Sequence, residues 1–136
     1  MKISRILVSV IFLLLSCSSK LPPDNNWSIG KWTLIELKEV PVKQSGNTNK
    51  DAHLVFETAA KNYRRFGGCN PINGTYTINN GKIKFTAQVY HLAACPDMPF
   101  ETTFLNALNE VDKYLVTGNT LVLKKGKTTL IKMQRK

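Results

Sequence analysis

The sequence has few of the side chains on which most catalytic sites depend. It contains two histidines, three cysteines and nine Asp or Glu residues among 136. Nucleophilic catalysis needs a serine or cysteine beside a histidine base and an orienting acid, and glycoside hydrolysis needs paired carboxylates. Neither His53 nor His91 stands at a sequence spacing from a nucleophile and an acid that indicates a catalytic site. The acidic residues are scattered. We therefore expect a protein that is not an enzyme.

Length and apolar runs set two further limits. A two-domain enzyme of the dinucleotide-binding or barrel type needs roughly 200 residues or more, so 136 residues fit one globular domain. The mostly apolar stretch from Ile6 to Leu15 would form about 15 Å of helix, half of the roughly 30 Å that a bilayer core requires. That stretch is too short to cross a membrane.

The first seventeen residues have the pattern of an export signal. Lys2 and Arg5 precede the apolar stretch and Ser16-Cys17 follow it, which predicts a signal peptide in residues 1–16. The segment from Leu14 to Cys17 resembles the bacterial lipobox, so lipid attachment is expected at Cys17. Residues 17–26, rich in Ser, Pro and Asn, would then form a flexible tether. A soluble secreted protein with an accidental cysteine at this place is the alternative.

Basic residues outnumber acidic ones by nineteen to nine, for a net charge of +10, and loss of Lys2 and Arg5 with the signal peptide leaves +8. Such a charge favours binding to an anionic membrane surface or to a nucleic acid. An exported protein rarely meets nucleic acid. The expected location is the bacterial cell envelope, with membrane attachment through the lipid. Ser18 after the lipidated cysteine favours the outer membrane, on either its periplasmic or its surface-exposed face.

Two cysteines, Cys69 and Cys95, are left once Cys17 is assigned to lipid. Outside the cytoplasm a pair of cysteines can form a lasting disulfide, and closing a loop of this length is worth about 3.5 kcal/mol in the chain-entropy model. Two free thiols are one alternative, and a metal site that adds His53, His91 or Asp97 is another. Because zinc usually takes four ligands at short paired spacings, the sequence gives little support for a metal.

From Trp27 onward apolar residues recur mostly at every second position in short runs, which is typical of an antiparallel β domain. Strands are expected at residues 32–37, 51–57, 75–79, 82–86, 114–117, 120–124 and 128–133. The pair joined by Asn80-Gly81 is the clearest hairpin, because both residues tolerate positive φ. His53 is expected to be exposed, opposite the face that carries Leu54 and Phe56. The lysines of residues 124–127 are expected in a solvated turn.

One segment has helical rather than strand periodicity. Apolar residues recur at helical spacing at Phe100, Phe104, Leu105, Leu108 and Val111. Pro99 suits a first helical turn, and Asp97 is the better of two candidate caps. The sequence therefore predicts one short helix whose apolar stripe belongs to the core.

Several motifs in a fixed order carry a resemblance to a known family. The chain reads Phe66-Gly67-Gly68-Cys69-Asn70-Pro71, then Ala94-Cys95-Pro96, then Phe104-Leu105-Asn106-Ala107-Leu108 before a final run of strands. In these motifs residues 27–133 resemble the META domain family, which includes HslJ-type heat-inducible proteins and many bacterial lipoproteins. The resemblance implies a mainly β (α+β) fold, a small antiparallel β-barrel or curled sheet with one short helix packed at one end.

The motif residues are interpreted as architectural. Gly67-Gly68 lets the backbone bend where a side chain would clash, Asn70 can hydrogen-bond its own turn, and Gly74 is expected to start the next strand. No Gly-Lys-Ser/Thr follows and the next element is a hairpin, so a phosphate loop is rejected. With a disulfide between Cys69 and Cys95, this turn and Pro96 would join a strand to the start of the helix.

The function expected is that of a lipid-anchored, non-catalytic envelope protein, an envelope stress or maintenance factor that acts through protein or surface contacts. We expect a monomer with an unidentified envelope protein as partner, and no cofactor, metal or nucleic acid. A small carrier barrel for a hydrophobic ligand is the alternative. A carrier needs a continuous apolar cavity, whereas a structural module would be filled by five aromatic side chains, Trp32, Phe56, Tyr76, Phe85 and Phe104.

Overall fold

The computed structural model describes residues 27–47, 49–89 and 91–135. The predicted signal peptide, the lipid attachment at Cys17 and the tether lie outside the described residues. The described chain forms one helix, α1 (Met98–Glu110), and nine strands: β1 (Lys31–Leu37), β2 (Val40–Pro41), β3 (His53–Glu57), β4 (Asn62–Phe66), β5 (Pro71–Asn79), β6 (Lys82–Gln88), β7 (Lys113–Thr117), β8 (Thr120–Lys125) and β9 (Thr128–Arg135).

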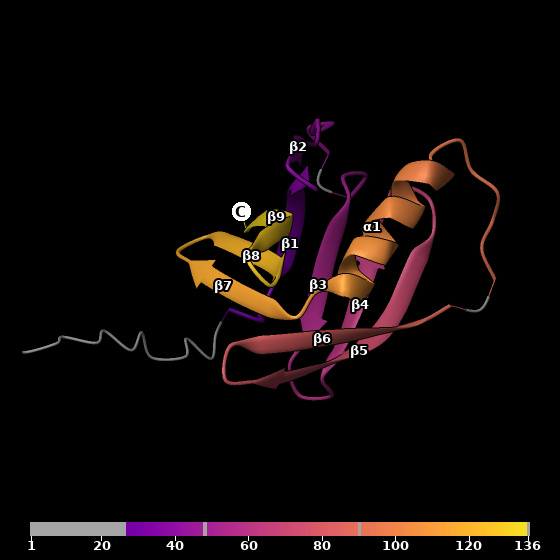
Figure 1. The fold of residues 1–136 in the computed structure, drawn as a ribbon. Helices are drawn as coiled ribbons and strands as arrows, with labels where there is room; N and C mark the ends of the chain where they lie inside the picture. Colours follow the sequence, from indigo (N-terminus) through magenta and orange to yellow (C-terminus); the bar gives the residue numbers. More distant parts are fainter. Residues whose placement is uncertain (1–26, 48, 90, 136) are drawn as a thin grey trace, which may run out of the picture.

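The strands form one antiparallel sheet that curls until its ends meet (Figure 1). Their order is β2-β1-β3-β4-β5-β6-β7-β8-β9, and β1 also pairs with β9. The ring is weakest between β6 and β7, which pair only at Lys82 and Lys113. Helix α1 packs beside β6 and β9. The expected fold class is confirmed, in its curled-sheet form rather than as a regular barrel.

Aromatic side chains fill the interior of the ring. The five expected core residues, Trp32, Phe56, Tyr76, Phe85 and Phe104, are all at most 5% exposed. The Phe56 and Tyr76 rings meet edge to face with centroids 5.2 Å apart, a favoured geometry for aromatic pairs. The interior therefore holds packed side chains where a carrier would need an apolar cavity.

The domain begins beside β7. The Trp32 indole donates a hydrogen bond of 2.9 Å to the backbone oxygen of Trp27. The Trp27 ring stacks on Tyr114 with centroids 4.9 Å apart and meets Phe56 edge to face. These contacts fix the place at which the chain enters the sheet.

Helix α1 covers the ring with its apolar side. Of the predicted stripe, Phe104, Leu108 and Val111 are buried, whereas Phe100 and Leu105 are half-buried. Pro99 lies in its first turn, as expected, and Asp97 precedes it. The Asp97 side chain, however, makes no capping hydrogen bond. The backbone N–H of Glu101 donates to the Asp97 carbonyl instead, at 3.0 Å.

The strand predictions were incomplete. Strands β2 and β4 were not predicted, and β5 begins at Pro71 rather than at residue 75, so Gly74 lies inside a strand and does not start one. Gly74 is needed there because the Tyr63 ring covers it: a Cβ would come 2.5 Å from Tyr63 Cε1. The Tyr63 ring thus occupies the space that a side chain at position 74 would need.

The prediction that His53 is exposed was wrong. The residue is 8% exposed. Its Nδ1 lies 2.7 Å from the backbone oxygen of Asp51, to which it donates, and its ring lies 5.5 Å from that of Phe66. Burial lowers the pKa of His53. Alternation along β3 misled here because the outer face of the sheet is itself covered at this end.

Candidate functional site

The most organised polar site in the described residues is buried between α1 and the Gly-Gly-Cys-Asn turn. Glu101, in the first turn of α1, is 2% exposed. Its Oε1 accepts hydrogen bonds of 2.7 Å from the backbone N–H groups of both Cys69 and Asn70. Its Oε2 accepts a third bond, of 2.8 Å, from Asn70 Nδ2. The turn therefore wraps a carboxylate with three donors.

Asn70 connects this carboxylate to the segment that precedes the helix. Its Nδ2 also donates to the Ala93 backbone oxygen at 3.1 Å, and its Oδ1 accepts from the Ala93 N–H at 2.9 Å. The two bonds to Ala93 fix which end of the amide faces Glu101. We call Arg65, Asn70, Ala93 and Glu101, with the backbone of Cys69, the Glu101 cluster.

The disulfide lies next to this cluster. Cys69 and Cys95 are joined, with their Cα atoms 6.4 Å apart, within the usual range for a disulfide. Of the alternatives left open by the sequence, the structure contains the disulfide. It links the turn to the same segment that Asn70 holds through Ala93.

Arg65 supplies a buried positive charge from β4. The residue is 1% exposed, its guanidinium lies over the Phe104 ring at 5.3 Å, and its Nη1 donates to the Glu101 backbone oxygen at 3.4 Å. Burial lowers the pKa of Arg65, and the Glu101 charge opposes that shift. Such a buried cation is tolerated only beside a negative partner.

The carboxylate of Glu101 is held in its charged form. Burial alone would raise its pKa, but the hydrogen bonds from Asn70 and Cys69 and the charge of Arg65 outweigh burial. The pKa of Glu101 is therefore lowered from its usual 4.5. Because these donors come from the turn and engage both oxygens, the cluster holds the turn against the first turn of the helix.

Gly67 is required by the close approach of this cluster. A Cβ at Gly67 would come 2.5 Å from Arg65 Nη1 and 2.9 Å from Glu101 Cγ. Overpacking of this kind typically costs 1–3 kcal/mol. We expect Gly67→Ala to lower the free energy of unfolding by about 2 kcal/mol, measured by urea denaturation. An unchanged stability would contradict the packing described for Gly67.

From the sequence, Gly67, Gly68, Asn70, Gly74 and Pro96 were interpreted as structural, but neither charged member of the cluster was given a role. Two signals pointed to them. Arg65 occupies an inward position, two residues after Tyr63 in an alternating run. Glu101 lies three residues before Phe104, on the buried stripe of the helix. Opposite charges at two buried positions suggest that the side chains interact. The residues near each one in the sequence do not indicate that the two are close in space.

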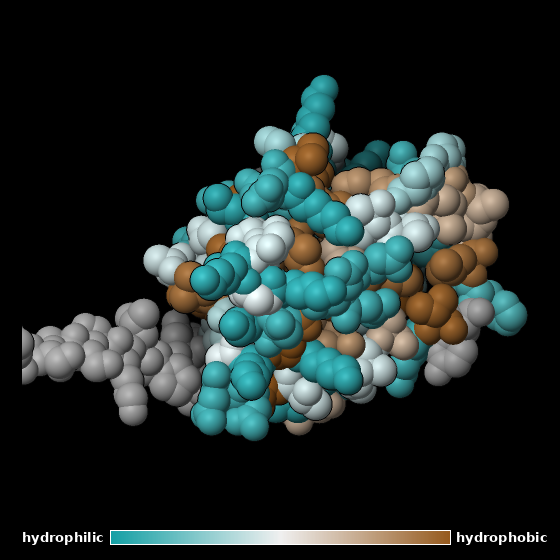
Figure 2. Space-filling view, viewed as in Figure 1, coloured by the Kyte–Doolittle hydropathy of each residue, from teal (hydrophilic) through white to brown (hydrophobic). Residues whose placement is uncertain are grey.

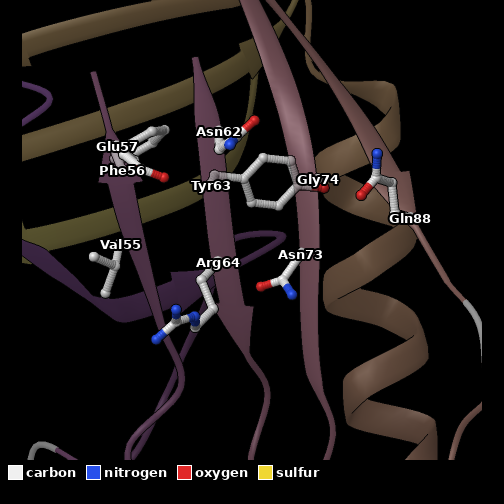
Figure 3. Close-up of a pocket in the computed structure, with 9 residues that line it drawn as sticks. All are labelled: Val55, Phe56, Glu57, Asn62, Tyr63, Arg64, Asn73, Gly74 and Gln88. Carbon is white, nitrogen blue, oxygen red and sulfur yellow. The ribbon is translucent and has the colours of Figure 1, made fainter. Parts of the chain in front are cut away.

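A second site is a depression of about 680 Å³ against β3, β4, β5 and β6 (Figure 3). Its lining combines amide, guanidinium and carboxylate groups with a few apolar atoms: Val55, Phe56, Glu57, Asn62, Tyr63, Arg64, Asn73, Gly74 and Gln88. One register row crosses it, since Val55 pairs with Arg64 and Arg64 with Asn73. Such a surface can hydrogen-bond a polar group, but its lining offers no nucleophile with a base beside it.

In the part of the chain that the structure describes, no three His, Cys, Asp or Glu side chains gather as a metal site would need. None of its helices is long and apolar enough to span a bilayer.

Comparisons with known proteins agree with this fold. The model of the META domain family matches residues 26–136, and no curated protein matches the chain. The NMR structure of a protein from Burkholderia xenovorans is 22% identical over 78% of this chain and 81% of that one, with a TM-score of 0.61. The crystal structure of a DUF4847 family protein from Bacteroides vulgatus is 15% identical over 81% and 94%, with a TM-score of 0.63. At these identities the likeness concerns the fold alone.

Proposed function

Because the chain belongs to the META domain family, we propose that it is a lipid-anchored protein of the bacterial cell envelope that acts through contacts with other envelope components and not by catalysis. The anchor is a lipid on Cys17, the domain is the curled sheet, and the role is in envelope stress or maintenance. The observation that carries the proposal is the position of Cys17, which follows a short apolar run in a lipobox-like context.

The described structure supports an extracytoplasmic location in one respect. A disulfide joins Cys69 and Cys95, and structural disulfides persist outside the cytoplasm but are rare inside it. The bond also links two segments that the Glu101 cluster holds together. A stabilising disulfide suits a small domain that has no cytoplasmic chaperones around it.

The non-catalytic part of the proposal draws on the two polar sites. The oxygens of the Glu101 carboxylate are occupied by donors of its own chain. The depression on β3 to β6 is lined mainly by amides and single charges. The META domain family is also not a known enzyme family. The interior does not support the carrier alternative, because the five core aromatic residues are packed there.

The anchor is tested by substitution of the cysteine. Native protein is expected in the membrane fraction, resistant to high-salt washing and released by detergent, because several acyl chains give stable attachment. Cys17→Ala is expected to move most of the protein into the soluble or salt-released fraction and to abolish labelling by radioactive palmitate. Ser19→Ala, outside the lipobox-like segment, is the matched control and is expected to fractionate as the native protein does.

A Cys17→Ala protein that still needs detergent for release, or native protein that takes up no palmitate, would contradict the lipid anchor.

A further inference from the structure

Three lysines lie side by side across three strands on the outer face of the ring. Lys82 on β6 is directly opposite Lys113 on β7, and Lys113 is directly opposite Lys124 on β8. Side chains at directly opposite positions of an antiparallel pair share a face and lie about 5 Å apart at Cβ, where like charges destabilise the sheet. We call Lys82, Lys113 and Lys124 the lysine row.

The lysines of the row form no ion pair with the described residues. Among these residues, Glu110 forms ion pairs with Lys38 and Lys125. Asp112 is the acid next to the row; its carboxylate accepts from the backbone N–H of Gly126 at 3.0 and 3.2 Å, keeps its negative charge and offsets one of the row's three positive charges. Lys84 lies two residues beyond Lys82 on the same face and adds a further cation.

The row is accompanied by an exposed apolar side chain. Leu115 is 50% exposed and lies two residues after Lys113, on the same face of β7. Its cross-strand partner is Val122, which is half-buried. Figure 2 shows hydrophilic side chains with hydrophobic atoms between them over the region where Figure 1 places β6, β7 and β8. Surfaces that lie in a membrane interface combine cationic residues with apolar ones.

Trp27, where the domain begins, lies against β7 on the core side of the sheet, opposite the face that carries the lysine row. Its ring stacks on Tyr114, which packs against the core, while Lys113 and Leu115 on either side of Tyr114 face outward. Residues 17–26 separate Trp27 from the proposed anchor, and ten residues reach at most about 36 Å. A tether of this length would allow the lysine row to reach the membrane.

We propose that the lysine row and Leu115 form a docking face that binds the anionic phospholipid headgroups of the membrane in which the protein is anchored. This inference rests on the proposed function. The partner is chosen by charge, since each Lys near an anionic surface contributes attraction, and by the proposed lipid anchor, which keeps the domain at a membrane. Repulsion within the row, a cost to the isolated domain, is relieved when the lysines meet lipid phosphates.

The test measures peripheral binding without the anchor. Full-length Cys17→Ala protein is mixed with phosphatidylcholine vesicles that contain or lack phosphatidylglycerol, and binding is measured by co-sedimentation. Adding K82Q, K113Q and K124Q is expected to weaken binding to the anionic vesicles roughly 100-fold, because one Lys is worth about fivefold near such a surface. Adding K43Q, K50Q and R64Q, which removes the same charge from the β2–β3 loop and β4, is expected to weaken binding less than tenfold.

Several results would overturn the proposal. They are equal losses in the two triple variants, unchanged binding in the lysine-row variant, equal binding to vesicles without phosphatidylglycerol, and tighter binding to duplex DNA than to anionic vesicles. Thermal unfolding adds a check on folding. Removing like charges that lie opposite one another is expected to leave the Tm unchanged or higher, and a lower Tm would assign the lysines a structural role. The assay uses unlipidated protein, so it can fail while the palmitate test succeeds, or the reverse.

Discussion

Cys69→Ala is expected to lower the free energy of unfolding by about 3.5 kcal/mol, the value of a cross-link that closes a loop of this length in the chain-entropy model. Cys95→Ala should cost the same, because each substitution removes the same bond. The double variant should then be no less stable than either single variant. Urea denaturation without reductant measures all three proteins.

Reduction of the native protein supplies the matched control. With dithiothreitol, its unfolding curve is expected to move to that of the single variants, which themselves should not respond to the reductant. Additive losses in the double variant, or no response of the native protein to dithiothreitol, would show that the two thiols act independently.

Glu101→Gln is expected to lower the free energy of unfolding by about 3 kcal/mol, the upper end of the range for losing hydrogen bonds to a buried charged group. The amide would keep one oxygen for the N–H groups of Cys69 and Asn70, but its nitrogen would face Asn70 Nδ2, and two donors would then meet. Asn70 cannot turn over without losing both bonds to Ala93. The substitution would also leave the buried charge of Arg65 uncompensated.

Glu110→Gln is the matched control on the same helix. Glu110 is an exposed carboxylate with a 3.1 Å contact to Lys125, and exposed pairs of this kind contribute little to stability because water and salt screen them. Equal losses at the two glutamates would contradict the structural role given to the Glu101 cluster.

The difference in stability between the native protein and Glu101→Gln is expected to depend on pH. The folded-state pKa of Glu101 is lowered from 4.5, its value in an unfolded chain. Its contribution is therefore complete above pH 4.5 and is lost as the pH falls through the folded-state pKa. The stabilities of native protein and Glu101→Gln should approach each other in acid. A constant difference down to acid unfolding would contradict the lowered pKa.

The sequence was sufficient for features determined by neighbouring residues. The β5–β6 hairpin follows from Asn80-Gly81, which have φ of 47° and 76°, as its turn requires. The helix follows from its apolar period and Pro99. The cysteine count favoured one disulfide over other uses, but only the fold brings Cys69 and Cys95 to 6.4 Å between Cα atoms.

The sequence was insufficient where distant residues decide the structure. Arg65 breaks the apolar face of β4, and its negative partner Glu101 lies 36 residues further along the chain. His53 looked exposed because alternation describes one strand, whereas Phe66 on the next strand covers part of its ring. The Glu101 cluster combines a turn, a helix and a connecting segment, so it could not be assembled from any single motif.

The central claim is that the protein is exported, carries lipid on Cys17 and has its two remaining cysteines paired. Intact-mass spectrometry of protein extracted from its own membranes, after alkylation without reductant, tests this directly. The expected mass is that of a chain that starts at Cys17, carries acyl groups and takes up no alkylating reagent at Cys69 or Cys95. A chain without acyl groups and with two alkylated thiols would contradict the account.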